Sequence, residues 1–301
     1  MAKTVLVMGA SGLFGSRAVQ AFGAAGWAVN KYQRGSDPVE AGRGVDVVVN
    51  AMNPPMYHDW KRLVPQIAEQ GLKAAGTSGA TLIVPGNVYV YGQEPAPWGP
   101  QTRHNPVSRK GAIRAEMEAR LRAASENGQQ VIILRGGDFI DPEAPSTFLN
   151  MIILKGLAKG RMTTAAPMDV PRAWAYLPDM TRAVVALADR RDSLPAFNDV
   201  PFAGYTFSMA DLKADLERLT GRDVKVSRFA WWAMTLAAPF WELARELREM
   251  RYLYDLPHRL DGKVLGDLLP DFRQTSFEVV LKDHVERLVP QSPAMVTQTG
   301  R

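Results

Sequence analysis

The sequence has no cysteine and only four histidines among its 301 residues. Without cysteine, disulfide frameworks, thiolate metal sites and cysteine nucleophiles are all excluded. The histidines are few and scattered, so we predict no metal site. Any chemistry must therefore come from other side chains or from a bound cofactor.

The sequence also has no long apolar segment. Its most apolar uncharged run, residues 229–241, has thirteen residues and is interrupted by Pro239, whereas a membrane-spanning helix needs about 20. We predict a buried or interfacial helix here and no stable membrane insertion, with a membrane-surface role as the alternative. The first residues lead into an apolar strand-like stretch without a cleavage-type segment, which predicts a cytoplasmic protein.

Charge of one sign is not concentrated anywhere. Residues 1–130 hold 14 Lys and Arg against 9 Asp and Glu, while residues 131–301 hold 22 of each kind, so the net charge of +5 belongs to the first part. This excess is too small and diffuse for a nucleic-acid surface, and we predict no nucleic-acid partner. It suits a small anionic ligand.

The first half of the chain alternates short β-branched runs with helical patterns, which indicates βαβ units and a parallel sheet. We predict strands at residues 4–8, 27–33, 45–50, 80–84 and 131–134, and helices at 11–25, 60–75 and 107–127. Helical patterns follow at 146–159, 180–189, 208–219 and 231–252. The predicted fold is α/β: a Rossmann-type doubly wound parallel sheet with a smaller, mostly helical C-terminal substrate lobe.

The predicted division gives residues 1–140, with returning segments from about 165–205, to an NAD(P)-binding domain. The remainder of residues 141–290 forms the substrate-binding lobe, and residues 291–301 form a disordered tail.

The strongest local motif is the glycine-rich turn Gly9-Ala10-Ser11-Gly12-Leu13-Phe14-Gly15, which follows the first strand and opens a helix. Gly9 permits the tight turn, Gly12 lets backbone N–H groups approach a pyrophosphate, and Gly15 lets the helix pack closely on the sheet. The helix N-terminus adds partial positive charge. We predict dinucleotide binding by Gly9, Ser11, Gly12, Leu13, Phe14 and Gly15.

The end of the second strand bears on which dinucleotide binds. An acidic side chain there would bind the ribose hydroxyls of NAD, but the sequence continues Lys31-Tyr32-Gln33-Arg34 with no carboxylate before Asp37. Arg34 could meet a 2′-phosphate in a bidentate contact, assisted by Lys31. The predicted cofactor is NADP, with NAD possible if Arg34 is only a solvated surface residue.

These motifs together resemble the extended and atypical short-chain dehydrogenase/reductase superfamily, whose members are often labelled NAD-dependent epimerase/dehydratase. The matching features are the glycine-rich turn, Asn50-Ala51-Met52-Asn53 after the third strand, Val88-Tyr89-Val90-Tyr91-Gly92 after the fourth, the helix from Val107, Leu134-Arg135-Gly136-Gly137-Asp138-Phe139, and Tyr176-Leu177-Pro178-Asp179. The resemblance implies that Ala51 and Met52 contact the cofactor.

The usual catalytic set of this superfamily, a serine and a Tyr-x-x-x-Lys pair, is missing. The resemblance puts Asn87 at the serine position, Ser108 at the tyrosine position and Ala112 at the lysine position. A second resemblance, to isoflavone-reductase-like members, concerns the helix containing Lys110, Arg114 and Glu118. It implies that Lys110 points at the nicotinamide ribose and acts as acid/base; an ion-paired surface stripe is the alternative. We therefore take Lys110 and Asn87 as the catalytic candidates.

Substrate contacts are expected at the carboxyl edge of the sheet. Tyr91 follows the fourth strand, and Asp138 and Phe139 follow the fifth. The resemblance places Asp138 where epimerases often carry a substrate-binding asparagine. Packing is the alternative for Tyr91.

Two functions remain open from the sequence. One is an NAD(P)-dependent oxidoreductase or epimerase-like enzyme acting on a small carbonyl or sugar-like substrate, as a monomer or homodimer. The other is a non-catalytic NAD(P)-binding redox sensor or regulatory protein, since a sensor tolerates loss of the Ser-Tyr-Lys set.

Overall fold

The computed structural model describes residues 3–289, and its centre is a sheet of six parallel strands. Their spatial order is β2-β1-β3-β4-β5-β9. The bounds are Thr4–Met8 for β1, Ala28–Lys31 for β2, Val47–Asn50 for β3, Thr81–Gly86 for β4, Val131–Arg135 for β5 and Phe197–Pro201 for β9. The order reverses direction between β1 and β3, the position at which doubly wound sheets leave a crevice at the carboxyl ends of their strands.

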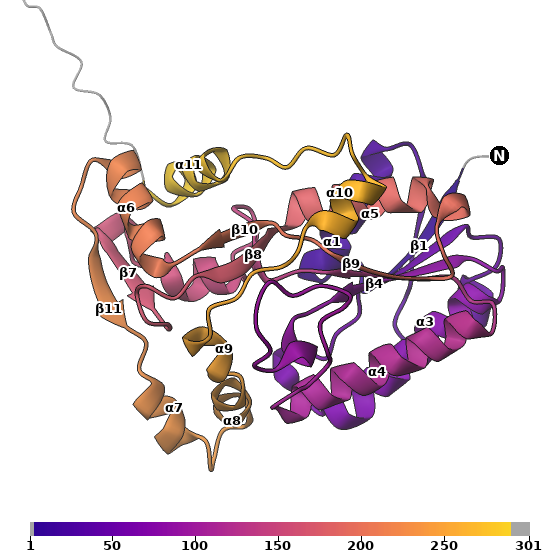
Figure 1. Ribbon diagram of the computed structural model, residues 1–301, viewed down its shortest axis with the longest axis horizontal. Helices are drawn as coiled ribbons and strands as arrows, with labels where there is room; N and C mark the ends of the chain where they lie inside the picture. The colour runs from indigo at the N-terminus through magenta and orange to yellow at the C-terminus, as the bar shows by residue number, and fades with distance from the viewer. Residues whose placement is uncertain (1–2, 290–301) are drawn as a thin grey trace, which may run out of the picture.

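Helices cover both faces of this sheet (Figure 1). One face packs against α1 (Leu13–Ala24), α5 (Leu177–Asp189) and α10 (Lys263–Leu268). The other packs against α3 (Trp60–Gly76) and α4 (Arg109–Glu126), with the short α2 (Pro38–Ala41) beside α3. The β-branched strands are thus buried on both sides, as expected of a parallel sheet.

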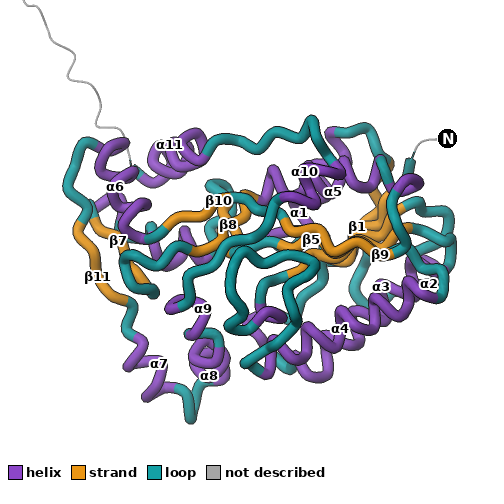
Figure 2. The backbone as a smooth tube through the Cα atoms, in the orientation of Figure 1, coloured by secondary structure: helices purple, strands orange, loops and turns teal. Residues whose placement is uncertain are grey.

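The second lobe surrounds a separate core that includes Trp174, Phe207 and Leu212. It contains the three-stranded sheet β10-β8-β6 and the two-stranded sheet β11-β7. Its strands are β6 (Asp138–Ile140), β7 (Arg161–Thr164), β8 (Arg172–Tyr176), β10 (Tyr205–Phe207) and β11 (Lys225–Arg228). Its helices are α6 (Met209–Thr220), α7 (Trp231–Ala237), α8 (Glu242–Glu249), α9 (Tyr252–Asp255) and α11 (Phe277–Leu288). The tube in Figure 2 shows these strands running between the helices.

The fold class predicted from the sequence is confirmed, but two predicted helices are wrong. The stretch 146–159 forms only a π-helical turn at Leu149–Ile153 and a 3-10 turn at Leu157–Lys159, because Gly156 interrupts it and Gly160, with φ +63°, ends it. The predicted helix 231–252 is broken into α7, α8 and α9. Pro239 cannot continue α7, since it lacks an N–H donor.

The small strands of the second lobe are absent from the sequence-based prediction. They have three to five residues each, too few to show an alternating pattern. The predicted tail 291–301 lies outside the described residues.

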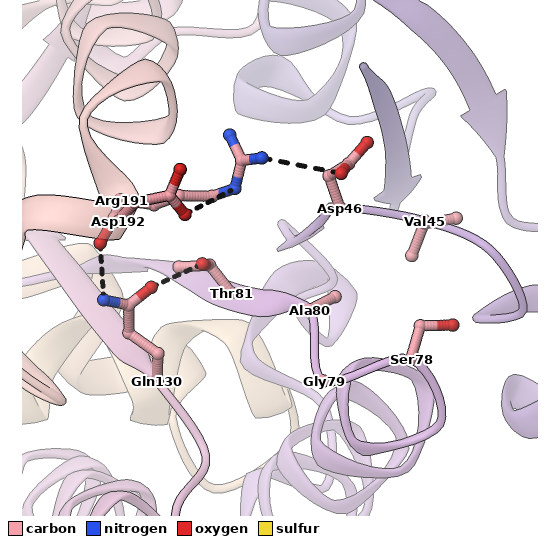
Figure 3. A pocket seen from close by; sticks show the side chains of 9 residues that line it. All are labelled: Val45, Asp46, Ser78, Gly79, Ala80, Thr81, Gln130, Arg191 and Asp192. Carbon is pink, nitrogen blue, oxygen red and sulfur yellow. Dashed lines mark hydrogen bonds and ion pairs between the residues drawn. The ribbon is translucent and has the colours of Figure 1, made fainter. Parts of the chain in front are cut away.

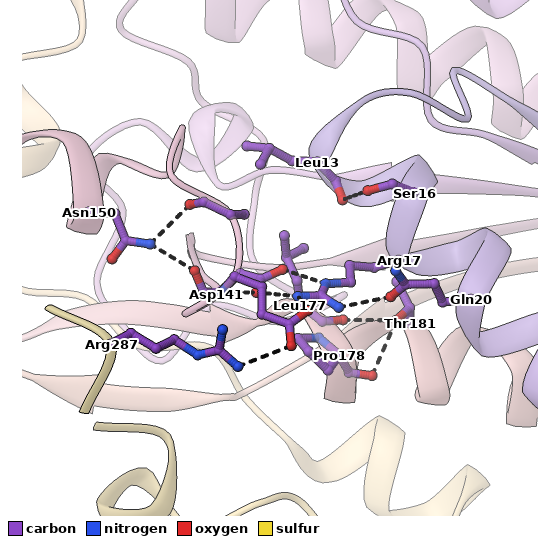
Figure 4. Close-up of polar contacts among 12 residues, drawn as sticks. Leu13, Ser16, Arg17, Gln20, Asp141, Asn150, Leu177, Pro178, Thr181 and Arg287 are labelled. Carbon is purple, nitrogen blue, oxygen red and sulfur yellow. Dashed lines mark hydrogen bonds and ion pairs between the residues drawn. The ribbon is translucent and has the colours of Figure 1, made fainter. Parts of the chain in front are cut away.

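An ion pair connects the first helix of the sheet domain to the second lobe (Figure 4). The Arg17 guanidinium on α1 donates to both carboxylate oxygens of Asp141, each at 2.6 Å, just after β6. Asp141 is fully buried, and its backbone oxygen accepts from the Asn150 side chain at 2.8 Å. This bidentate pair fixes the angle at which the second lobe meets the glycine-rich turn.

Candidate functional site

The glycine-rich turn between β1 and α1 has the close backbone packing that its sequence predicts. A Cβ at Gly15 would lie 2.1 Å from the Gly9 carbonyl oxygen, and one at Gly9, where φ is +81°, would lie 2.9 Å from the backbone of Ala51 and Met52. Only glycine fits at both positions. The turn and the segment after β3, which the sequence analysis assigned to the same cofactor, are therefore in contact.

The N-terminus of α1 has the features of an anion cradle. The helix begins after Gly12, no side chain caps it, and its first turn carries no acidic residue. Its first N–H groups are therefore available to a phosphate, with the helix dipole adding favourable charge. The residues present fit a dinucleotide pyrophosphate.

The end of β2 presents basic side chains to solvent. Lys31 and Arg34 are both exposed. Asp37, the first carboxylate after the strand, accepts a hydrogen bond from Val39 N at 2.9 Å as the N-cap of α2. That carboxylate is occupied as a helix cap.

A cavity of about 760 Å³ opens at the carboxyl ends of β3, β4 and β5. It extends from Phe14 of the glycine-rich turn to the second lobe. Among the sequence-predicted site residues, the structure brings Phe14, Ala51, Met52, Asn87, Asp138 and Phe139 to its wall. The Phe14 and Phe139 rings approach to 6.3 Å between centroids, so they join the cofactor side to the lobe side.

Two tyrosines that the sequence analysis did not select line the same cavity. The Tyr57 and Tyr89 hydroxyls are 3.2 Å apart and hydrogen-bonded. Burial raises the pKa of both, and that of Tyr89 well above its ordinary value. For Tyr57, the hydrogen bond with Tyr89 opposes this rise in pKa, which makes Tyr57 the more acidic of the two.

Tyr57 lies in a strained segment. Met56, Tyr57 and Asp59 all have positive φ, of 51°, 63° and 44°. Non-glycine residues rarely adopt this conformation, and clusters of such strain are found at functional sites. The strain turns the segment that follows β3 back across the cavity.

Arg114, one turn into α4, is the only cationic side chain in the described wall of this cavity. It donates to the Asn53 side-chain oxygen at 2.7 Å, and its guanidinium stands 4.9 Å from the Trp60 ring centroid. Arg114 Nε and Trp60 Nε1 are buried without a hydrogen-bond partner among residues 3–289. Buried donors are normally paired, so these two N–H groups are exceptions among the described residues.

Asn87 is held by its neighbours. Its side-chain oxygen accepts from Tyr89 N at 3.1 Å, and its backbone oxygen accepts from Arg135 Nη1 at 2.6 Å. The fully buried Arg135 also forms ion pairs with Glu118 on α4 (2.8 Å) and Asp199 on β9 (2.9 Å). This network fixes the loop after β4, and with it the Asn87 wall of the cavity.

Lys110, proposed as the catalytic lysine, has a different environment from the one expected. Its ammonium is buried and pairs with Glu249 at 2.9 Å and with Glu246, both on α8. Its backbone N–H also donates to Glu249, at 2.9 Å. The side chain does not line the cavity, although its Nζ is 5.1 Å from the Tyr57 ring centroid. The catalytic role of Lys110 stays a prediction, and its observed contacts anchor α8.

Two other positions discussed from the sequence, Tyr91 and Ser108, have structural roles. Tyr91 is fully buried beside Trp98, and its hydroxyl donates to the Gly99 carbonyl at 3.3 Å, so the structure does not bring it to the cavity. Ser108 caps α4 by accepting from Gly111 N at 3.0 Å. Asp138 does line the cavity, but it forms an ion pair with Arg172 of β8.

The residues missed from the sequence had weak signals. Tyr57 follows a proline pair and Trp60 begins the next helix, a context in which aromatic side chains usually pack. The sequence indicates Arg114 only as part of a helical stripe. These residues come together because of the turn after β3. Met56 and Tyr57 have positive φ in that turn, and no glycine in the sequence indicates such a conformation there.

A second, smaller pocket of about 280 Å³ lies at the amino ends of the same strands (Figure 3). Within residues 3–289, no helix has both the length and the apolar character needed to cross a membrane. The same range contains no group of three or more histidine, aspartate and glutamate side chains arranged to hold a metal ion.

Comparison with known proteins gives matches of structure. No family model matches the chain, and no curated protein matches its sequence. MoeE5 in complex with UDP-glucose and NAD is 16% identical, with a TM-score of 0.73 over 95% of this chain and 98% of that one. UDP-glucuronic acid 4-epimerase from Bacillus cereus, in complex with UDP-glucuronic acid and NAD, is 15% identical, with a TM-score of 0.74 over the same shares.

An enzyme described as UDP-galactose 4-epimerase gives a TM-score of 0.68 at 16% identity, over 95% of this chain and 98% of its own. The chain therefore has a Rossmann-type fold with an appended lobe, of the kind found in NAD-dependent sugar epimerases. These structures confirm the Rossmann-type fold expected from the sequence.

Proposed function

We propose that the protein is an NAD(P)-dependent oxidoreductase of the epimerase-like type, acting on a small carbonyl or alcohol substrate held between its two lobes. The observation that supports this proposal most strongly is that a single cavity extends from the glycine-rich turn to the second lobe. Its wall includes Phe14 of the uncapped anion cradle at one end and the second lobe at the other. A dinucleotide seated on the glycine-rich turn would reach this cavity with its nicotinamide end.

The cofactor contacts follow from the wall residues. The backbone of Ala51 and Met52, packed against Gly9, would lie along the dinucleotide. The guanidinium of Arg114, which lines the cavity, would donate to a ribose hydroxyl or another ligand oxygen, the role predicted for Lys110. Asn87, fixed by Tyr89 and Arg135, would supply an amide at the serine position.

Tyr57 is the proposed proton donor. A bound reduced nicotinamide supplies a hydride to the substrate carbon, and the carbonyl oxygen then needs one proton. Tyr57 holds such a proton at neutral pH, since the ordinary pKa of tyrosine is already about 10 and burial raises it further. The guanidinium of Arg114 lowers the pKa of Tyr57 and so opposes the cost of the phenolate left behind. The nearby carboxylates of Asp138 and Glu246 raise that pKa. Tyr89 can return a proton through the shared hydrogen bond.

The finer part of the proposal is a preference for NADP. It rests on exposed Lys31 and Arg34 after β2 and on the use of Asp37 as a helix cap. The solved neighbours with a named cofactor hold NAD. Equal affinity for the two dinucleotides, unaffected by Arg34→Ala, would remove the preference without affecting the rest of the proposal.

A second candidate function is a non-catalytic dinucleotide-binding regulator. The observation that favours it is the structural use of the positions where catalytic groups would stand. Ser108 caps a helix, and Lys110 is committed to two carboxylates of α8. This candidate predicts cofactor binding without hydride transfer to any acceptor.

The test is a pair of glycine variants on one helix. In Gly15→Ala the new methyl group would meet the Gly9 carbonyl, whereas in Gly23→Ala it would meet open space. Fluorescence titration with NADPH and NADH should give a dissociation constant at least 30-fold weaker for Gly15→Ala and an unchanged one for Gly23→Ala. Wild-type protein that binds neither dinucleotide, or a Gly15→Ala variant that binds as tightly as wild type, would contradict the proposal.

A further inference from the structure

The part of the second-lobe wall formed by residues from Ser146 onward is almost entirely apolar. Of its lining residues in the segment from Ser146 onward, Ser146 alone is polar. The others include Phe148, Met151, Phe229, Met234, Trp241 and Leu247. This wall faces the proposed nicotinamide region, so it is the surface that a substrate would contact.

The cavity is poorly suited to a nucleotide diphosphate. Such a group is normally held by several cations or by a row of backbone N–H groups. Arg114 is the only cationic side chain in the described wall, and its guanidinium already donates to Asn53. Asp138 places a carboxylate in the wall, and its partner Arg172 does not line the cavity, so this ion pair adds no free cation for a diphosphate.

The apolar character continues to the mouth of the cavity. Met56, Met151 and Trp241 line the cavity and are also 64%, 47% and 48% exposed. The hairpin of α7 and α8, which contributes Trp241, carries further exposed apolar side chains, Leu236 at 69% and Phe240 at 93%. Methionines adapt their shape to irregular ligands. An apolar molecule thus meets apolar surface from the solvent to the interior.

We propose that the cavity takes a largely apolar substrate, a carbonyl compound on a hydrocarbon or fused-ring body, in place of a nucleoside-diphosphate sugar. The carbonyl part of this inference rests on the proposed function. The body of the substrate packs against the second-lobe wall, while its single oxygen faces Tyr57. The neighbours solved with UDP-sugars share the fold at 15–16% identity, and the wall is where this chain's chemistry departs from that ligand class.

The experiment is calorimetric titration of the whole protein with 2-acetylnaphthalene and, separately, with UDP-glucose. Each titration is run without dinucleotide and with saturating NADPH. The expected result is one ketone site per chain, with an affinity at least ten-fold higher than that for UDP-glucose. UDP-glucose binding as tightly as the ketone, or several weak ketone sites in place of one, would overturn the inference.

Two wall variants and a matched surface control locate the site. Met234→Asp and Trp241→Gln should each weaken ketone binding, Met234→Asp by ten-fold or more. Val279→Asp, on an exposed part of α11 outside the cavity, should not change it. Thermal unfolding of each variant reports whether it is folded. If Met234→Asp does not fold, Trp241→Gln provides the test of the wall. Unchanged affinity in a folded wall variant would contradict the assignment.

NADPH affinity separates this inference from the proposed function. Both wall variants should bind NADPH as wild type does, because they lie away from the glycine-rich turn. A protein that binds the ketone at this wall but no dinucleotide would refute the proposed function and leave the apolar site standing. A protein that binds NADPH and prefers UDP-glucose would refute the apolar substrate site and leave the proposed function standing.

Discussion

The two ends of the parallel strands differ in how their polar groups are used. At the amino ends, Gln130 donates to the Arg191 backbone oxygen at 2.8 Å and accepts from the Thr81 hydroxyl at 2.6 Å, and Arg191 pairs with Asp46 at 3.5 Å (Figure 3). At the carboxyl ends, Arg114 Nε and Trp60 Nε1 lack partners within the described chain.

The backbone shows the same contrast. Positive φ in non-glycine residues is confined, among residues 3–289, to Met56, Tyr57 and Asp59 beside the carboxyl-end cavity. A protein satisfies its buried groups and relaxes its backbone where only stability is at stake. The strained segment and the cavity beside it mark the carboxyl ends as the end that is built to hold a ligand.

The largest effect expected from this contrast is on the rate of the reaction. Tyr57→Phe removes the proposed proton donor and should lower the rate of NADPH oxidation with 9,10-phenanthrenequinone, a reactive dicarbonyl probe, by about 100-fold or more. NADPH affinity should be retained. Tyr205→Phe is the matched control, since the Tyr205 hydroxyl donates to Thr275 outside the cavity. Wild-type protein without any turnover would favour the regulator, and full activity in Tyr57→Phe would exclude Tyr57 as donor.

The next effect concerns the wall that α8 provides. Lys110→Ala leaves Glu246 and Glu249 without their buried cation, and should lower the free energy of unfolding by about 3 kcal/mol. NADPH affinity should stay within two-fold. Urea unfolding and cofactor titration measure the two quantities. Lost cofactor affinity at unchanged stability would instead return Lys110 to the ribose contact predicted from the sequence.

A pH effect of similar size comes from the loop packing beyond β4. Burial lowers the pKa of His258, which stacks on Trp98, to about 4. The unfolded chain takes up this proton near pH 6.5 and the folded chain does not, so stability is lost as the pH falls from 6.5 to 4. His258 accounts for about 3 kcal/mol of the unfolding free energy that is lost over this pH range. His258→Phe should flatten the pH dependence of the urea midpoint, and an unchanged slope would contradict the assignment.

The smallest effect belongs to the amino ends. Thr81→Val removes the hydrogen bond to Gln130 and should cost about 1 kcal/mol of unfolding free energy. NADPH affinity and quinone reduction should not change. Any loss of cofactor binding in this variant would indicate that the cofactor binds at the amino ends of the strands, contrary to the proposal.

Much of the sheet domain could be predicted because its signals are local. The turn Gly9–Gly15, the β-branched strands and the helices between them are each encoded within about twenty residues, as is the absence of a carboxylate at the end of β2. Phe14 is predicted from the glycine-rich turn, whereas Ala51 and Met52 are implied by the family resemblance, and the structure brings the three residues to a common region.

The rest depends on contacts between distant residues. Lys110 meets Glu246 and Glu249, more than 130 positions away, so a helical stripe could not reveal that α8 would engage it. Tyr57 reaches the cavity through positive φ values that its own sequence does not require. The second-lobe wall combines the turn near Phe148 with α7 and α8, and the strands that position them are too short to read from a pattern.

Hydrogen exchange with and without a dinucleotide tests the contrast between the two ends most directly. With saturating NADPH, we expect slower exchange of backbone amides in Gly9–Gly15, Ala51–Asn53 and Asn87–Tyr89, and unchanged exchange at the amino ends around Ser78–Thr81 and Gln130. Slower exchange confined to the amino ends, or no local change at a concentration that saturates binding, would contradict the placement of the cofactor at the carboxyl ends of the sheet.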